Sequence, residues 1–282
     1  MKLSFHSWAY GSMFSRIPSY PLEETIKRVA RIGYQGIEIG AARPHAWPPD
    51  LASKDRLKIK KLLARYELEV AAICPNNENL NPASPIKQER LEAIEHYRDC
   101  VKLAADLKSP VVVFIPGWRI YGTTFSQAWK RSVEALKSTL ELAEKLNVFV
   151  AIEPVNSFRT NLVIRSDQAL AMRDEVKSTR AKLLLDTIHV WLEKENPVDV
   201  VNAYGQNLVH IHCVDAVHGL YERKIPGQGE FGFKSFIAAL RKIGYQGYLS
   251  VEVWGISPDE IAQQSYAFLN PMVNSYSSGR EK

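Results

Sequence analysis

Cysteine is scarce in this sequence, and the spacing of the few cysteines excludes several kinds of site. Only three occur among 282 residues, namely Cys74, Cys100 and Cys213. No CxxC pair is formed, so neither a disulfide framework nor a zinc knuckle is expected, and we predict reduced thiols. Cys74 closes the apolar run at 70–74 and could face a binding site, although a packed thiol is an equal alternative.

Long apolar runs and targeting signals are also missing. No run approaches the roughly 18 residues that a membrane-spanning helix needs, and the first residues lack the pattern of a secretory signal peptide. The net charge is +5, but the Lys and Arg residues form no block of the nucleic-acid-binding kind. We therefore expect a cytoplasmic protein that binds neither membranes nor nucleic acid, with a mild preference for anionic substrates.

Several catalytic motifs are absent. The sequence has no GxSxG, no HExxH and no P-loop lysine motif, so nucleophilic hydrolysis and P-loop phosphoryl transfer have no support. A GxGxxG match at 227–232 does not lie on the first strand–helix turn of a βαβ unit. We interpret it as a flexible loop, which would allow the preceding Arg223 to swing over a binding site.

What the sequence does contain is an alternation of strand-like and helix-like segments. Eight strand patterns alternate strictly with eight amphipathic helical patterns. This alternation predicts a parallel sheet with right-handed crossovers. Eight units over this length predict an α/β fold, a single (β/α)8 TIM barrel, with a doubly wound sheet as the alternative. We place the barrel domain at residues 1–275 and expect residues 276–282 to form a disordered tail. The expected strands span 3–8, 36–39, 68–74, 110–115, 148–153, 181–186, 208–212 and 248–252, and the expected helices span 21–32, 54–66, 85–107, 125–146, 166–176, 197–203 and 233–243, with a last helix from about 258.

Four strand-like runs in the second half of the chain end in side chains that can bind a metal, namely Glu153, Asp186, His212 and Glu252. The carboxyl ends of neighbouring parallel strands meet at one rim of a barrel. Three carboxylates and an imidazole gathered there would repel one another unless a cation lay among them. Taken singly each residue has a plainer role, as Asp186 could cap the next helix. The convergence predicts one divalent ion, Mn²⁺, Mg²⁺ or Co²⁺, with Zn²⁺ left open.

Other polar residues are expected near the same rim. His189 lies three residues beyond the acidic end of the sixth strand. We place it on the loop just above the metal, where it could bind a substrate hydroxyl, while a helix N-terminal or packing role is the alternative. His6 and Glu38, on the first two strands, could line the floor or mouth of the pocket. His210 and His212 share one strand face, so one of them could be a core imidazole.

Five segments resemble the xylose-isomerase-like TIM barrel superfamily. Within it the chain is most similar to the sugar isomerase/epimerase branch, which includes ketose 3-epimerases and fructoselysine 3-epimerase. The resemblance implies a cytoplasmic isomerase of carbohydrate metabolism (EC 5.1.3 or 5.3.1 type) that acts on a small sugar or polyol and assembles as a homodimer or homotetramer. The segments that carry it are Ile152–Asn156, Leu185–His189, His210–His212, Arg223–Gly229 and Ser250–Glu252.

The resemblance also assigns roles to these residues. Glu153, Asp186, His212 and Glu252 would hold one metal, typically Mn²⁺, and the two glutamates would act as the acid/base pair. His189 and Arg223 would bind substrate oxygens. The implied reaction is C3 epimerisation of a ketose or ketose derivative, with proton abstraction next to the carbonyl through a metal-bound enediolate. His6 and Cys74 are further candidates for substrate contact.

One position departs from the branch. Arg159 stands where these enzymes usually carry a glutamate that contacts substrate. We expect Arg159 to favour a substrate with a carboxylate or phosphate, unless it points outward to solvent.

Three other functions stay open. The first is a metal-dependent dehydratase or lyase acting on an inosose, keto-glycoside or related polyol. An endonuclease IV-type DNA repair enzyme would need extra histidines for three zinc ions, and the third and fourth strands end without one. The last is a non-catalytic barrel that binds a partner.

Overall fold

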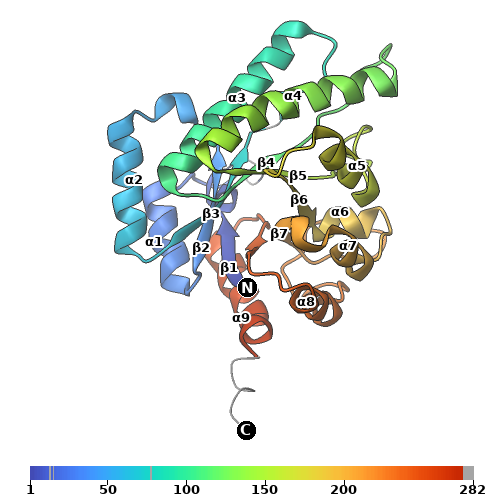
Figure 1. The fold of residues 1–282 in the computed structure, drawn as a ribbon. Helices are drawn as coiled ribbons and strands as arrows, with labels where there is room; N and C mark the ends of the chain where they lie inside the picture. The colour runs from blue at the N-terminus through green and yellow to red at the C-terminus, as the bar shows by residue number, and fades with distance from the viewer. Residues whose placement is uncertain (13, 15, 77, 276–282) are drawn as a thin grey trace.

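The strands of this protein form one closed barrel. The computed structural model describes residues 1–12, 14, 16–76 and 78–275. Within them eight parallel strands pair in chain order, and β8 pairs with β1 to close the sheet. Figure 1 shows the helices arranged as a ring around the strands. The prediction of a single (β/α)8 barrel is confirmed. The strands are β1 (Lys2–His6), β2 (Gly36–Ala41), β3 (Glu69–Pro75), β4 (Val111–Phe114), β5 (Phe149–Ile152), β6 (Ala181–Asp186), β7 (Leu208–Cys213) and β8 (Tyr248–Val251).

The helices follow the expected pattern with one addition. α6 (Thr187–Leu192) begins directly after β6 and is followed by α7 (Pro197–Tyr204) before β7. The predicted strict alternation is therefore wrong at this point, because a helix of six residues is too short to show a clear helical period. The other α-helices are α1 (Leu22–Ile32), α2 (Ser53–Arg65), α3 (Lys87–Leu107), α4 (Phe125–Leu146), α5 (Ser166–Val176), α8 (Phe233–Lys242) and α9 (Pro258–Asn274).

The first strand is shorter than the sequence predicted. It ends at His6, and Ser7–Tyr10 forms a 3₁₀ turn, η1. The turn begins here because Nδ1 of His6 accepts a hydrogen bond from the backbone N–H of Trp8 at 3.2 Å. A side chain that satisfies a free backbone donor in this way competes with continuation of the strand.

The barrel separates two apolar layers. Residues such as Phe5 and Ile152 belong to a large cluster that joins the strands to the surrounding helices. Other strand residues, such as Ala72, Val113 and Leu184, form a second, smaller cluster. Successive side chains of a strand point to opposite faces, so the second cluster fills the barrel interior and supports the rim from below.

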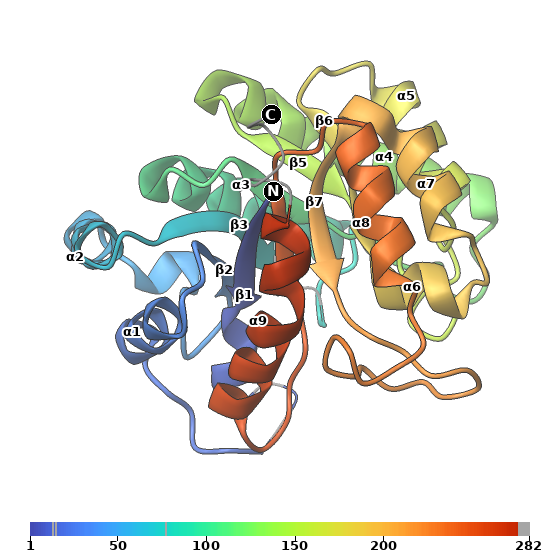
Figure 2. The same cartoon turned by 90° about the horizontal axis from the view of Figure 1, so that it is seen from below.

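The loop that follows β7 is the longest connection at the rim. Figure 2 shows it extending past the arrowhead of β7. Asp215 ties it together, because its carboxylate accepts backbone N–H groups of Ala216, Gly227 and Phe231 at 2.9, 2.8 and 2.9 Å. The GxGxxG segment is thus part of a loop, as predicted. This loop was predicted to be flexible, but its backbone makes three hydrogen bonds to the Asp215 carboxylate.

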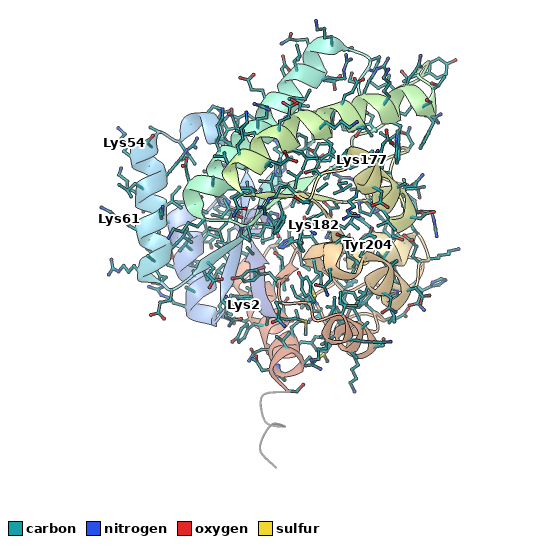
Figure 3. All side chains as sticks on the ribbon, in the orientation of Figure 1. Lys2, Lys54, Lys61, Lys177, Lys182 and Tyr204 are labelled. Carbon is teal, nitrogen blue, oxygen red and sulfur yellow. The ribbon has the colours of Figure 1, made fainter. Side chains whose placement is uncertain are left out.

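The outer surface carries much of the positive charge. Lys54 and Lys61 point outward from α2 (Figure 3), and both are exposed. Among the described residues no helix has the length and apolar character to cross a membrane. The tail predicted at 276–282 lies outside the described residues.

Candidate active site

Four predicted metal ligands meet at the rim of the barrel. They are buried, and the ligand atoms of Glu153, Asp186, His212 and Glu252 all lie within 4.8 Å of one another. Nδ1 of His212 is 3.0 Å from Glu153 Oε1, 3.1 Å from Glu252 Oε2 and 3.9 Å from Asp186 Oδ2. Three carboxylate oxygens and one imidazole nitrogen form a donor set that suits a divalent cation.

The strand register explains this convergence. Asp186 on β6 lies opposite His212 on β7, which in turn lies opposite Ser250 on β8. Glu153 is one residue past the end of β5, and its N–H bonds to Phe114 O at 2.9 Å, which extends the β4–β5 pairing. The ends of β5 to β8 therefore present their side chains at one level.

Asp186 has both of the roles that its sequence context offers. Its Oδ1 accepts the backbone N–H of Ile188 at 2.9 Å and so caps α6. Its Oδ2 lies 3.0 Å from Nη2 of Arg223 and faces the cluster. Burial by itself would raise the pKa of this carboxyl, but the nearby Arg223 guanidinium holds it below the usual value.

The buried carboxylates repel one another, and this repulsion affects the pKa values of the groups beside them. Burial alone would lower the pKa of His212, but the facing carboxylates of Glu252, Glu38 and Glu153 hold it well above its usual value. Burial raises the pKa of Glu252 to about 8, although Arg223 and His212 oppose that rise. The raised pKa values of Glu252 and His212 show that added positive charge is favourable here, and a divalent cation would supply it.

Arg223 enters the cluster itself. Its guanidinium contacts Asp186 Oδ2 at 3.0 Å and Glu252 Oε2 at 2.8 Å, and it lies 4.7 Å from the centre of the Trp254 ring. Arg223 lines the cavity, and the backbone of the next residue, Lys224, forms an antiparallel bridge with Asp215. That Arg223 can swing over the mouth stays a prediction. The side chain is 16 % exposed.

Glu38 supports His212 from beneath. Its Oε1 is 3.0 Å from Nε2 of His212, and its Oε2 is 2.8 Å from Nε2 of His210. Burial alone would raise the pKa of Glu38, but the surrounding imidazoles hold it well below its usual value. A carboxylate that accepts the Nε2 proton leaves Nδ1 of His212 to face the ligand cluster. His210 is the core imidazole that the sequence allowed.

Of the two further candidates for substrate contact, Cys74 lies at the cavity and His6 lies away from its lining. Cys74 lines the cavity above the cluster, and burial raises the pKa of its thiol well above the usual value, so it stays protonated. Among the described residues His6 is not part of the cavity lining. It is buried beside Trp8, with its Nε2 3.6 Å from Glu38. Contact between His6 and a substrate stays a prediction.

His189 lies on α6 and not on a loop, because Asp186 starts the helix directly after β6. Its Nδ1 is 2.6 Å from Nδ2 of Asn156. The amide orientation follows from its other end, since Oδ1 of Asn156 accepts the backbone N–H of Phe158 at 3.0 Å. The amide of Asn156 thus donates to Nδ1 of His189, so the proton of the neutral imidazole is on Nε2. Nε2 of His189 lies 3.5 Å from Oδ2 of Asp186. His189 presents a donor to the cavity.

The cluster opens into a cavity of about 410 Å³, a size typical of small-molecule sites. Glu153 and Glu252 lie at its inner end. Arg159 also lines it, where it pairs with Glu78, and both side chains are nearly half exposed. The further lining residues include Trp8, Phe14, Trp118, Phe158, Tyr221 and Trp254.

Sequence reasoning missed several of these residues. Asn156 lies inside a segment that was singled out for its resemblance, but no local pattern shows that it holds His189. Glu78 and Trp254 come from separate loops, and no spacing in the sequence links them to the cluster. Asp215 lies two residues past the end of β7 and resembles an ordinary turn residue.

Comparison with known proteins agrees with this architecture. A family model described as xylose isomerase-like TIM barrel matches residues 26–272. Fructoselysine 3-epimerase of Shigella flexneri is 26 % identical over 235 residues, covering 83 % of this chain and 85 % of that protein. L-ribulose 3-epimerase of Methylomonas sp. (strain DH-1) is 28 % identical over 230 residues, covering 81 % and 77 %.

Solved structures are similar over the whole barrel. D-psicose 3-epimerase with D-tagatose from Clostridium cellulolyticum H10 has a TM-score of 0.82 at 21 % identity, covering 97 % of this chain and 99 % of that one. A structure of IOLI protein with a bound zinc atom has a TM-score of 0.79 at 20 % identity, covering 99 % and 100 %. At these identities the likeness establishes the fold.

Proposed function

This chain belongs to the xylose isomerase-like TIM barrel family, and we propose that it is a metal-dependent ketose 3-epimerase. Its similarity to fructoselysine, ribulose and psicose 3-epimerases places it in the sugar isomerase/epimerase branch, as an enzyme of the isomerase class. The substrate would be a ketose or ketose derivative, and the reaction would invert the carbon next to the carbonyl.

One observation carries the proposal: two buried glutamates flank the same imidazole at the inner end of a cavity. Glu153 Oε1 and Glu252 Oε2 lie 3.0 and 3.1 Å from Nδ1 of His212. They directly follow β5 and β8, and β6 and β7 lie between these strands, so the two carboxylates reach the cavity from separate parts of the rim. Inversion at one carbon needs a base on one face of the substrate and an acid on the other.

The metal would be held by Glu153, Asp186, His212 and Glu252. We propose Mn²⁺, with Mg²⁺, Co²⁺ or Zn²⁺ as alternatives. A divalent ion bound there supplies positive charge that stabilises the negative charge left when the sugar loses its proton. One glutamate takes the proton from carbon, and the opposite glutamate returns a proton to the other face. The Nε2–H of His189 and the guanidinium of Arg223 would donate to substrate oxygens and fix the sugar between the two carboxylates.

The test is hydrogen exchange in D₂O with a panel of ketoses (fructose, psicose, tagatose and ribulose) and added Mn²⁺, followed by NMR. We expect exchange of the C–H beside the carbonyl and formation of the C3 epimer without loss of mass. Elemental analysis should find one metal per chain.

Variants at the two glutamates test their roles. Glu153→Gln and Glu252→Gln should each reduce kcat by about 10²–10⁴-fold, as expected for loss of general acid/base catalysis. Exposed Glu260, far along the chain on α9, provides the control Glu260→Gln with unchanged kcat. Undiminished exchange in Glu153→Gln would refute its assignment. Loss of water from the product would identify a dehydratase or lyase, and three zinc ions per chain would favour the DNA-repair alternative.

A further inference from the structure

A second cavity lies at the opposite end of the barrel from the metal-ligand cluster. Its volume is about 420 Å³, and its lining includes the first residues of four strands, namely Lys2, Glu69, Phe149 and Tyr248. Cavities of this size hold small molecules. The carboxylate of Glu69 is already paired, because it accepts hydrogen bonds from Nζ of Lys2 at 2.8 and 2.7 Å and from the hydroxyl of Tyr248. A ligand in this cavity therefore meets a neutralised carboxylate.

Lys182, near the start of β6, points into the barrel at this end. It lies opposite Ala151 in the strand register, and Leu184 is two residues further along β6. Ala151 and Leu184 both belong to the inner apolar cluster, and alternate residues of a strand share one face. Nζ of Lys182 lies 5.7 Å from the centre of the Phe149 ring, which lines the cavity. An inward-facing lysine is unusual unless a partner accepts its charge.

Two arginines lie beside Lys182. Nη2 of Arg173 donates to Oδ1 of Asn207 at 2.8 Å, and Nζ of Lys182 donates to the same oxygen at 3.3 Å. The guanidinium carbon of Arg180 lies 5.1 Å from the centre of the Phe149 ring. We call Arg173, Arg180 and Lys182 the basal cations. They surround two neutral groups, the Asn207 carboxamide and the Phe149 ring.

The charge of the basal cations is poorly compensated. Among the described residues the only carboxylate within 4 Å of them is that of Asp174, which pairs with Arg173 at 2.5 Å. Arg180 donates instead to the carboxamide of Asn147. Partial burial and the two neighbouring guanidinium groups lower the pKa of Lys182. Nε of Arg173 is buried and has no hydrogen-bond partner in the part of the chain that the structure describes. Positive charge and N–H donors are therefore available to an anion.

A phosphate group fits these observations. Its oxygens can accept several N–H bonds at once from guanidinium and ammonium groups. The aromatic side chains of Phe149 and Tyr248 in the cavity lining suit the ring of a sugar or a nucleoside. We propose that the basal cations bind the phosphate of a small phosphomonoester, whose uncharged ring enters the cavity beside Phe149 and Tyr248. This site is separate from the catalytic cavity and does not depend on the reaction proposed above.

The test is calorimetric titration of the full chain with AMP, adenosine and inorganic phosphate at low ionic strength, where charge interactions are weakly screened. AMP and adenosine differ only in the phosphate. We expect AMP to bind at least about tenfold more tightly than adenosine, since each partly exposed ion pair contributes about two- to fivefold. Inorganic phosphate should bind more weakly than AMP, because it lacks the ring.

Three variants locate the phosphate. Lys182→Met and Arg180→Met should each raise the Kd for AMP by about three- to tenfold and leave the Kd for adenosine unchanged. Exposed Lys54, on α2, gives the control Lys54→Met, which removes the same charge and should bind AMP like the wild type. Without ligand, Lys182→Met should not lower the urea midpoint, because it relieves repulsion among the basal cations. AMP should raise the midpoint of the wild type more than that of Lys182→Met.

Several outcomes would overturn the proposal. Equal Kd values for AMP and adenosine would show that no phosphate site exists. Equal, weak binding of AMP and inorganic phosphate that Lys182→Met does not change would indicate an adventitious ion only. An equal loss in Lys54→Met and Lys182→Met would show attraction by net charge alone. Loss of AMP binding in Arg159→Met, with binding retained in Lys182→Met, would place the phosphate in the catalytic cavity.

Discussion

Replacing Glu38 by Gln tests whether a residue outside the ligand cluster controls metal binding. The amide has nearly the same volume, so packing in the barrel interior is kept. Each carboxylate oxygen of Glu38 faces a different imidazole, at 3.0 Å for His212 and 2.8 Å for His210. Gln offers one acceptor and one donor. One imidazole must therefore change its tautomer or lose its hydrogen bond.

The size of the effect follows from these contacts. A buried hydrogen bond to a charged group contributes about 1.5–3 kcal/mol. Loss of such a partner behind a ligating histidine typically costs about 10–100-fold in metal affinity, which corresponds to about 1.4–2.8 kcal/mol. We expect the Kd for Mn²⁺ to rise by this factor in Glu38→Gln, because Nδ1 of His212 is no longer fixed as the nitrogen that faces the cluster.

The assay is calorimetric titration of metal-free protein with Mn²⁺ at constant pH, alongside denaturant unfolding of the metal-free form. Glu69→Gln is the control, since Glu69 begins β3 at the other end of the barrel and bonds to Lys2. A wild-type Kd in Glu38→Gln would refute the orienting role. A lower free energy of unfolding without a change in Kd would show that Glu38 acts only in packing.

Three further predictions concern the surroundings of the site. A Cβ at Gly40 would lie 1.8 Å from Nε1 of Trp8, which lines the cavity. Gly40→Ala should therefore lower the free energy of unfolding by about 1–3 kcal/mol and reduce kcat/KM by displacing Trp8. An unchanged urea midpoint and activity would contradict this prediction. Burial lowers the pKa of His45 to about 4, with its bond to a backbone carbonyl opposing the shift. Because the unfolded chain binds this proton more readily, the contribution of neutral His45 to stability is full above about pH 6.5 and falls as the pH drops toward 4, by about 2 kcal/mol at pH 5. In urea titrations, the stability of His45→Gln should depend less steeply on pH than that of the wild type. Parallel curves of stability against pH for the two proteins would refute this prediction. Asp215→Ala removes three hydrogen bonds and should expose residues 214–232 to limited proteolysis and lower kcat/KM, whereas an equally resistant loop would show that other contacts hold it.

The sequence alone determined the barrel and the four residues of the ligand cluster. Alternating strand and helix periods are local patterns, and a parallel barrel places all strand ends at one rim. The grouping of Glu153, Asp186, His212 and Glu252 therefore follows from the sequence alone. The short helix α6 escaped because six residues carry too little periodicity.

Tertiary structure decided which other side chains join the cluster. Closure of the barrel brings Glu38 on β2 to His212 on β7, 174 positions away in the chain. Glu78 and Arg159, 81 positions apart, meet only because their loops face one cavity. Arg223 turns inward because the backbone of Asp215 pairs with that of Lys224. Contacts of this kind depend on how the loops pack in space, and no residue spacing along the chain records them.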